Sequence, residues 1–448
     1  MRVLLISANI LTSPYPVYPI GLDYVAAVLK PAHQVRMLDM NCVDIRDVKA
    51  VILEFQPEVV GISLRNIDNT DTTDPQGFMD GYRRLTETVR THCSAPIVLG
   101  GAGFSIFPEK ILDALAADYG IVGEGDHMTA LLDALATGAP TAGLPGVVAP
   151  DSAPGRPVAA ASGFQRRFDA QSDHLAYYLQ HGGMLNLQTK RGCPFRCIYC
   201  TYPNIEGRWL RLMDPESVAD TAKALEDAGA RYFFIVDSAF NADVAHSLAV
   251  AEQFRNKGVS IPWGAFLAPL QMPRDYFDVL ARAGLSHVEF GTESLSDRVL
   301  RAYGKPFHRR WVLEAHEQAM EAGLHIAHYF LLGGPGETSE TLETTLSHVD
   351  KLKKSVLFLF CGMRIYPRTP LFERALEEGR IRPDQDLLEP VFYESPAMGR
   401  DAIIDRVKER ADGRVNWVVG SGGDEAGSLI QRMYKRGYTG PLWEFLIR

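Results

Sequence analysis

Short apolar runs alternate with amphipathic stretches from residue 1 to about residue 140. The apolar runs have the length of strands, and the stretches between them carry apolar residues at helical spacing. This repetition predicts a parallel sheet covered by helices on both faces. The expected strands are Val3–Ser7, Val35–Asp39, Val59–Leu64, Ile97–Gly101 and Gly120–Gly123, and the expected helices include Gly21–Leu29, Gly77–Arg90 and Glu109–Leu115.

The same alternation resumes at Met184. Six strand–helix units predict a partial parallel barrel, (β/α)6, in which catalytic groups line the carboxyl ends of the strands. The fold class is therefore α/β, with a Rossmann-like first domain, this barrel and a small C-terminal extension rich in helix. The expected strands are Met184–Thr189, Tyr232–Asp237, Trp263–Phe266, His287–Gly291, His325–Leu332 and Leu357–Ile365, and Pro215–Ala228 is expected to be a helix.

Composition shifts suggest where the domains end. Gly138-Ala139-Pro140 and Pro154-Gly155-Arg156-Pro157 are typical of a linker with little regular structure. The tail contains a helical stretch at Ile403–Arg410 and an aromatic end; we expect it not to continue the barrel but to dock on it and contribute to the substrate pocket. The predicted divisions are residues 1–140, 141–180, 181–380 and 381–448.

The overall charge and composition exclude several classes of protein. The chain has 448 residues, 46% of them hydrophobic and 23% charged, with a net charge of −9. That acidity argues against nucleic acid as a partner. No apolar run is long enough to span a bilayer, and Met1–Ile6 is predicted to be a strand, not a signal peptide. Six cysteines without a disulfide framework indicate a reducing cytoplasm.

Three of these cysteines, Cys193, Cys197 and Cys200, follow the first barrel strand with the spacing C-x3-C-x2-C. Three cysteines leave one over in any disulfide scheme, and a structural zinc site needs four ligands at other spacings. Buried, unreactive thiols are the remaining alternative, but Lys190, Arg191 and Arg196 should favour thiolates. Three thiolates leave one iron of a [4Fe-4S] cluster open to a small molecule. Cys42, Cys93 and Cys361 stand alone and receive no role.

This motif resembles the signature of the radical S-adenosylmethionine (SAM) superfamily, C-x3-C-x-aromatic-C, with Tyr199 at the aromatic position. Gly291–Lys305 and Tyr366-Pro367-Arg368-Thr369-Pro370 also resemble segments of that superfamily. The resemblance implies a [4Fe-4S] cluster on Cys193, Cys197 and Cys200, with SAM chelated to the open iron and cleaved by one electron to a 5′-deoxyadenosyl radical.

The resemblance also implies SAM-binding residues, and some of them have an ordinary structural alternative. Asp237 would accept a hydrogen bond from the SAM amino group, or it caps a helix. Glu293 and Ser294 would hold the ribose or the methionine end, although Ser294 is equally placed to cap a helix near Leu295. Gly333 and Gly334 would pass close to adenine, and Tyr199 would lie against the purine ring.

The first domain resembles the cobalamin-binding domain of one radical SAM subgroup. The resemblance is carried by Tyr18-Pro19-Ile20-Gly21-Leu22, by Gly100-Gly101 followed by Pro108-Glu109, and by Gly123-Glu124-Gly125. No D-x-H-x-x-G motif occurs, so any bound cobalt would lack a protein histidine beneath it; His33 and His127 are ordinary histidines. Ligands of such sheets bind beyond the carboxyl ends of the strands. The residues expected near cobalamin are Asp39, Asn41, Ser63, Arg65, Asn66, Gly100, Gly101, Gly123, Glu124 and Gly125.

A cobalamin domain before a radical SAM barrel implies a C-methyltransferase that moves a SAM-derived methyl group, by way of cobalamin, to a carbon of a small molecule. Three alternatives stay open: a radical rearrangement, ring contraction or cyclisation without methyl transfer; a polar methyl transfer without a deoxyadenosyl radical; and a cobalamin-binding protein without catalysis. A methylthiotransferase is disfavoured, because no additional cysteine cluster occurs in the first domain. A flavodoxin- or ferredoxin-type electron donor is implied, and neither membrane nor nucleic acid is expected as a partner.

Overall fold

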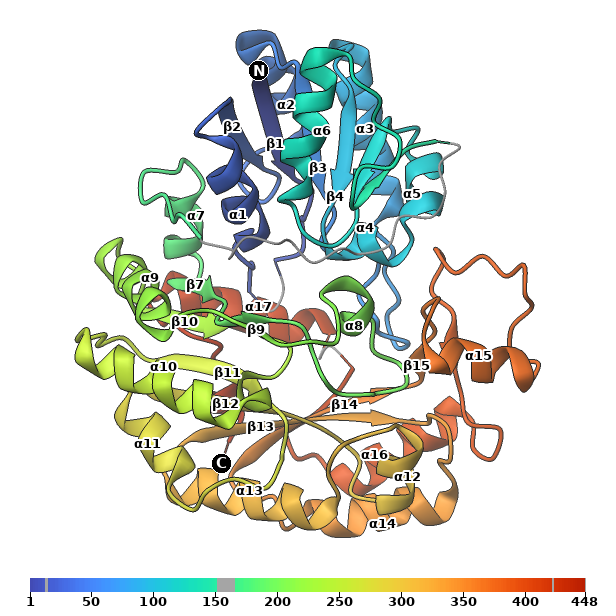
Figure 1. The fold of residues 1–448 in the computed structure, drawn as a ribbon. Coiled ribbons are helices and arrows are strands. Elements are labelled where there is room, and N and C mark those ends of the chain that lie inside the picture. Colours follow the sequence, from blue (N-terminus) through green and yellow to red (C-terminus); the bar gives the residue numbers. More distant parts are fainter. Residues whose placement is uncertain (13–14, 151–165, 421–422, 448) are drawn as a thin grey trace. The chain divides into compact units, whose positions relative to one another are not determined.

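The computed structural model describes residues 1–12, 15–150, 166–420 and 423–447. The chain forms two compact units, which are described separately (Figure 1). Unit 1 consists of Met1–Asn69, Gly77–Tyr178 and Asn204–Gly207, and unit 2 consists of Thr70–Gln76, Leu179–Pro203 and Arg208–Arg448.

Unit 1 is built around one sheet with the strand order β2-β1-β3-β4-β5-β6. All neighbours are parallel except β6, which is antiparallel to β5. Val3, Leu4 and Ile6 of β1 are fully buried, as expected for a strand covered on both faces. The strands are β1 (Arg2–Ser7), β2 (Gln34–Asp39), β3 (Val59–Ser63), β4 (Ile97–Gly100), β5 (Tyr119–Ile121) and β6 (Val147–Val148). The five predicted strands are therefore confirmed to within two residues at each end.

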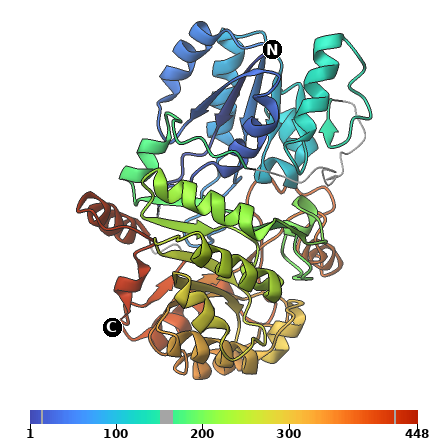
Figure 2. The same ribbon diagram turned by 60° about the vertical axis from the view of Figure 1, so that its left-hand side comes forward.

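Helices lie on both sides of this sheet (Figure 2). One core cluster packs Leu22 and Ala26 of α1 and Leu131 of α6 against Val3 and Leu5 of β1. The helices are α1 (Ile20–Leu29), α2 (Ile45–Phe55), α3 (Met79–His92), α4 (Ala102–Ile106), α5 (Pro108–Ala114), α6 (His127–Thr137) and α7 (Leu175–Gln180).

The region predicted to be a linker, residues 141–180, is more regular than expected. It contributes β6 to the edge of the sheet and the helix α7 to unit 1. These elements were missed because two and six residues are too few for a periodic pattern to stand out. Pro154-Gly155-Arg156-Pro157 lies outside the described residues.

Unit 2 is built around a seven-stranded parallel sheet with the order β17-β14-β13-β12-β11-β10-β7. Neighbours in sequence are neighbours in space, which is the order of strands in a (β/α) barrel. Among the described residues β7 and β17 do not pair, so the sheet is open. The strands are β7 (Met184–Leu187), β10 (Tyr232–Ile235), β11 (Trp263–Leu267), β12 (Leu285–Glu293), β13 (His325–Leu332), β14 (Ser355–Cys361) and β17 (Trp417–Val419).

Most helices of unit 2 connect these strands, and α10, α11, α13 and α14 follow one side of the sheet (Figure 1). Several begin with side-chain caps, such as Asp214 before α9 and Thr338 before α14. Helix α8 (Tyr202–Ile205) is divided between the two units. The helices of unit 2 are α9 (Pro215–Asp227), α10 (Val244–Asn256), α11 (Tyr276–Arg282), α12 (Asp297–Ala302), α13 (Arg309–Glu321), α14 (Ser339–Val349), α15 (Pro370–Glu377), α16 (Arg400–Ala411) and α17 (Gly423–Lys435). Two short ribbons pair β8 (Lys190–Arg191) with β9 (Arg211–Leu212) and β15 (Met363–Arg364) with β16 (Phe392–Tyr393).

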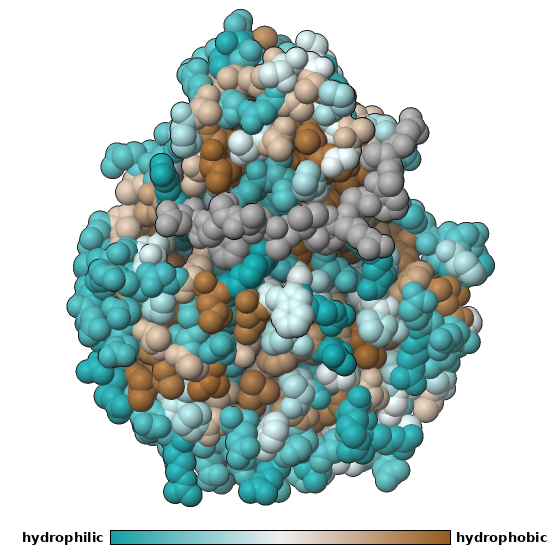
Figure 3. Space-filling view, in the orientation of Figure 1, coloured by the Kyte–Doolittle hydropathy of each residue, from teal (hydrophilic) through white to brown (hydrophobic). Residues whose placement is uncertain are grey.

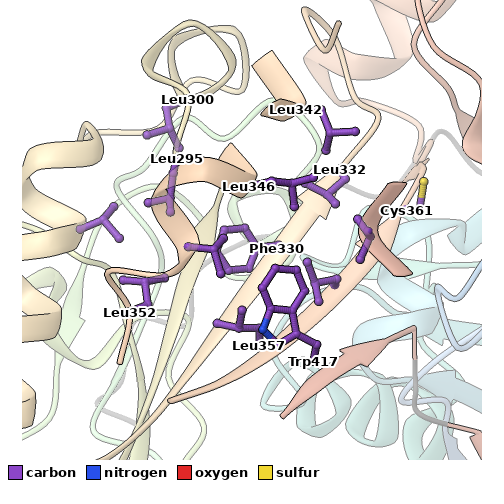
Figure 4. Packing of buried hydrophobic residues seen from close by; sticks show 14 of the residues in the cluster. Leu295, Leu300, Phe330, Leu332, Leu342, Leu346, Leu352, Leu357, Cys361 and Trp417 are labelled. Carbon is purple, nitrogen blue, oxygen red and sulfur yellow. The ribbon is translucent and has the colours of Figure 1, made fainter. Parts of the chain in front are cut away.

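The expectation that residues 381–448 do not continue the barrel is wrong. Strand β17 pairs parallel with β14, and the predicted helix, α16, lies between them in the sequence. Ile403 of α16 and Trp417 of β17 join the core cluster that contains Leu357 and Phe330 (Figure 4). A three-residue strand gives no alternation to detect, so only the helix could be found from the sequence.

The end of the tail docks on the opposite face of the same sheet. Trp443, in the 3-10 turn Trp443–Leu446, is buried against Ala327 and Val356, and its Nε1 donates to Glu289 Oε1 at 3.0 Å. The predicted docking is therefore present.

The face of the molecule drawn in Figure 3 is mainly hydrophilic. On the face drawn in Figure 3, hydrophobic residues gather only in small groups among hydrophilic ones. Among the described residues, no helix is both long and apolar enough to cross a bilayer.

Candidate functional site

The cysteine loop follows β8 at the carboxyl end of β7. Gly192 has a φ of 88°, which turns the chain into the loop, and Cys193 is buried. The middle of the loop is fixed by backbone hydrogen bonds from Ile198 N to Tyr303 O (3.0 Å) and from Leu371 N to Ile198 O (2.9 Å). Two distant segments of unit 2 therefore hold the loop that carries the motif.

One glycine that the sequence did not single out is essential to this arrangement. Gly304 has a φ of 68°, and a Cβ there would lie 2.4 Å from Arg196 O. The turn after α12 therefore approaches the cysteine loop too closely for any side chain. The only signal in the sequence was its place in the segment Gly291–Lys305.

The three cysteines of the motif lie close enough to affect one another's charge, and Cys193 is buried while Cys197 and Cys200 are partly buried. Burial raises the pKa of the Cys197 thiol, and it raises that of Cys200 to about 12; in both cases the neighbouring cysteines of the motif add to the rise. The expectation that Lys190, Arg191 and Arg196 promote thiolates stays a prediction. Lys190 is turned away to Asp237, and the cation that lowers the pKa of both thiols is Lys305.

The donor set fits an iron–sulfur cluster better than the alternatives. All six cysteines are free, which leaves no disulfide within the chain. Among the described residues no three His, Cys, Asp or Glu side chains are placed to hold a single metal ion. A cube with one iron for each cysteine separates its ligands more widely than a single ion does.

Glu293 sits at a bulge near the carboxyl end of β12. The pairing register with β13 shifts between Gly291 and Glu293, and Glu293 has a φ of 61°. Such a backbone conformation is uncommon for a residue with a side chain and is concentrated at functional sites. The carboxylate accepts from Tyr199 Oη at 2.7 Å and from Lys305 Nζ at 3.0 Å. The structure therefore brings two predicted site residues, Tyr199 and Glu293, into direct contact, and Lys305, to which the sequence analysis gave no role, donates to both.

Tyr199 is held by several contacts of its own. Its ring meets Tyr303 edge-on at 6.3 Å, and Lys305 Nζ lies 5.6 Å from its centroid. Burial, followed by the charge of Glu293, raises the pKa of Tyr199 well above its usual range. The expected contact of this ring with the purine stays a prediction.

Asp237 has a different structural setting from either of the two that were considered. It is 2% exposed, and its oxygens accept from Thr189 N (2.8 Å), Thr189 Oγ1 (2.6 Å) and Lys190 Nζ (2.7 Å). The following helix, α10, is capped by Asp243 instead, so the helix-cap alternative is wrong. Asp237 ties the end of β10 to the segment that leads into the cysteine loop. Its contact with SAM stays a prediction.

Ser294 does not cap a helix either. Helix α12 begins at Asp297 after the N-cap residue Ser296, and Ser294 Oγ instead shares a hydrogen bond with Thr345 Oγ1 at 2.9 Å. It also accepts from Ser296 N at 3.0 Å. These bonds anchor the turn after Glu293 to α14, and a SAM contact of Ser294 is untested.

Gly333 and Gly334 are explained by close packing within unit 2. Gly333 has a φ of 78°, and a Cβ on Gly334 would lie 2.5 Å from Tyr303 Oη and 2.7 Å from Met363 Cε. Gly334 N donates to Tyr303 Oη at 3.0 Å. Both glycines are needed even without a ligand, and their approach to adenine remains a prediction.

The strand order of unit 1 indicates at which edge of its sheet a ligand is expected to bind. The order 2-1-3-4-5 changes direction between β1 and β3, and ligands of such sheets bind at that point, beyond the carboxyl ends of the strands. Asp39, Ser63 and Gly100 end β2, β3 and β4 there. Asn9, which is buried just beyond β1, lies at the same edge and was missed because its segment had no glycine or motif.

Two of the predicted cobalamin residues hold a helix in place. Asp39 accepts from Tyr178 Oη of α7 at 2.5 Å and from Asn41 N at 3.1 Å, and Asn41 Nδ2 donates to Tyr178 Oη at 3.1 Å. Burial raises the pKa of Asp39. Asn41 Oδ1 is buried without a partner, so this side chain still has an acceptor to offer.

The glycines at this edge permit close approaches of the backbone. A Cβ on Gly101, whose φ is 94°, would lie 2.5 Å from Leu64 O, and one on Gly125 would lie 2.2 Å from Val25 Cγ2. Gly123 N donates to Ser105 Oγ at 3.0 Å, and Asn66 O accepts from Tyr82 Oη. Arg65 and the buried Glu124 lie in the same strand-end loops. Cobalamin contacts of all these residues stay predictions.

Comparison with known families assigns both units. Residues 187–349 match the family model of the radical SAM superfamily, and residues 6–133 match that of the B12 binding domain. The chain is a radical SAM protein with a B12 binding domain. The predicted cofactors, a [4Fe-4S] cluster, SAM and cobalamin, are confirmed by these two domains.

Relatives of this radical SAM protein extend over most of the chain. It is 25% identical to a tryptophan 2-C-methyltransferase from Streptomyces laurentii, over 81% of this chain and 73% of that protein. It is also 25% identical to a cytidylyl-2-hydroxyethylphosphonate methyltransferase from Streptomyces wedmorensis, over 84% and 80% of the two chains. The structure of the radical SAM methyltransferase TsrM from Kitasatospora setae matches with a TM-score of 0.87 and 22% identity, over 99% of this chain and 97% of that chain. The predicted α/β fold is thereby confirmed.

Proposed function

We propose that this radical SAM protein is a C-methyltransferase that moves a methyl group from SAM, by way of cobalamin, to a carbon of a small molecule. The observation that carries the proposal is the pairing of a B12 binding domain with a radical SAM domain in one chain. Relatives that share both parts over three quarters or more of this chain are methyltransferases with different substrates.

The residues of unit 2 would prepare the cluster site. Cys193, Cys197 and Cys200 would hold the cluster, and Gly304 and Ile198 fix their loop. The bound cluster supplies one electron, and cobalamin carries the methyl group. Cys193 is buried and Cys197 and Cys200 are partly buried, so the loop would limit the access of water to the cluster side of the site.

A band of aromatic rings supports a planar substrate. Parallel sheets are normally covered on both faces, yet Phe266 is 38% exposed and Tyr329 only half-buried on the face where Trp443 docks. Tyr329 stacks on Phe358 at 4.8 Å, and Phe266 meets Tyr329 at 6.2 Å. An aromatic ring placed here would extend this series of contacts. The first substrate to test is therefore tryptophan, the one named for the Streptomyces laurentii relative.

The electron donor would dock beside the cysteine loop. Trp209 is 84% exposed and Leu212 45% exposed, just after Cys200, and Arg196 and Arg208 are exposed on the same segment. A basic and aromatic surface on a chain of net charge −9 suits an acidic partner, such as a flavodoxin. Arg208→Glu should slow reduction by flavodoxin but not by dithionite. Equal slowing with both reductants would contradict this docking surface.

An oxygen-sensitive cluster and six free cysteines support a place in the reducing cytoplasm.

The function can be tested with anaerobically reconstituted protein, SAM deuterated at its methyl group, and tryptophan. We expect a product that carries the intact deuterated methyl group. A product of unchanged mass would favour a rearrangement, and the absence of any labelled product or labelled cobalamin would overturn the proposal. Measuring 5′-deoxyadenosine in the same reaction separates a radical from a polar transfer.

A further inference from the structure

Lys305 is a buried cation whose partners converge on the cysteine loop. Its side chain is 8% exposed, and Nζ lies 3.0 Å from Glu293 Oε1 and 3.2 Å from Tyr199 Oη. The ammonium lies over the rings of Tyr199 and Phe307, at 5.6 and 5.4 Å from their centroids. Its positive charge opposes the rise that burial causes in the pKa of the Cys197 thiol.

A lysine is seldom buried unless it is paired, and Glu293 supplies that pairing. The pair alone does not require a residue of the cysteine loop as a third partner. Gly304 lets the chain approach Arg196 O of the loop closely, and the next residue, Lys305, donates to Tyr199 Oη between Cys197 and Cys200. The arrangement therefore places a positive charge beside the cysteine loop, with the carboxylate of Glu293 within hydrogen-bond distance of it.

We propose that Lys305 is a positioning residue whose buried ammonium lies beside the cysteine loop and, balanced by Glu293, sets the reduction potential of the cluster. Nearby net charge is one of the factors that tune such potentials. Reduction adds negative charge to the cluster, so a nearby ammonium favours the reduced state and a nearby carboxylate opposes it. The inference rests on the cluster but does not require methyl transfer.

The test is an anaerobic redox titration, followed by electron paramagnetic resonance, of reconstituted protein without SAM. We expect Lys305→Met to shift the midpoint to a more negative potential, with about tenfold less reduced cluster at the wild-type midpoint; tenfold is 59 mV for a one-electron couple. Glu293→Gln should shift the midpoint in the opposite direction. The double variant should return close to the wild-type value, because the charges are again balanced.

Two further variants separate charge from structure. Lys305→Arg keeps the cation and should stay near the wild-type potential. Tyr199→Phe removes a neutral hydroxyl from the same group and should move the potential least. If Lys305→Met fails to assemble a cluster, the midpoint potentials of Glu293→Gln and Lys305→Arg still decide whether charge at this position sets the potential.

Shifts of one sign in both charge variants, or no shift in Glu293→Gln, would overturn the inference and leave the proposed function standing. Failure of wild-type protein to bind any cluster would instead remove the basis of the proposed function.

Discussion

The two units use the carboxyl ends of their strands differently. In unit 2 these ends carry buried charges in pairs, Asp237 with Lys190 and Glu293 with Lys305. In unit 1 they carry mostly glycines and short polar side chains, and Asp39 is held by a neutral tyrosine, Tyr178. Charged pairs fix side-chain positions around a small reactive centre, whereas glycines clear space along a backbone. The contrast suits a cluster in one unit and a large flat ligand in the other.

The largest effect is expected from a variant that removes one ligand of the cluster. Cys197→Ala should abolish iron and sulfide binding, because two thiolates cannot hold the cube, while cobalamin binding should stay at the wild-type level. Iron content and the absorption of bound cobalamin would be measured in the same sample. Cys93→Ala, which removes a lone cysteine of unit 1, is the matched control and should retain both cofactors. Loss of cobalamin from Cys197→Ala would show that the two sites are not separate.

A smaller effect is expected from breaking a buried charge pair of unit 2. Asp237→Asn leaves Lys190, which is 1% exposed, without its counter-charge, and should destabilise the unit by about 3–5 kcal/mol. Urea unfolding and hydrogen exchange at the Thr189 amide, which donates to Asp237, would report the loss. The exposed pair Arg310–Glu314 supplies the control, since Glu314→Gln should cost under about 1 kcal/mol. Equal effects of the two variants would refute the structural role assigned to Asp237.

In unit 1 the corresponding test is steric. Gly101→Ala forces a side chain into a positive φ and toward Leu64 O, and should cost about 1–3 kcal/mol. It should also weaken cobalamin binding, measured by equilibrium titration, because the strand-end loops must move apart. Gly81→Ala is the control: it lies in α3 with no atom within 4 Å of the added Cβ, so it should be neutral or stabilising by up to about 1 kcal/mol. Unchanged cobalamin affinity in Gly101→Ala would argue against a ligand at this edge.

The contrast also explains how much could be predicted from the sequence. Apolar runs located the strands of both units because buried parallel strands are almost continuously apolar, and the cysteine spacing located the cluster. The roles of Asp237 and Lys305 depend on partners 47 and more residues away, Lys190 for one and Tyr199 for the other, and no local pattern records such pairs. The glycines were found, but whether they clear space for a ligand or for Leu64 O could only come from the structure. Strand β17 was not predicted because its three residues are too few to show an alternating pattern.

The smallest expected effect concerns Asp39, a predicted cobalamin residue whose pKa is raised. Burial raises its pKa above the ordinary value of 3.8, so the folded state binds this proton more tightly than the unfolded chain. The stability that this proton contributes is complete below pH 3.8 and is lost as the pH rises through the higher, folded-state pKa. Stability of the wild type relative to Asp39→Asn should therefore fall as the pH rises from about 4 toward neutrality. The urea unfolding midpoints of both proteins, measured at the same series of pH values, would report this change. A difference in midpoint that does not vary with pH would mean that the hydrogen bonds from Tyr178 and Asn41 fully offset the burial of the carboxylate.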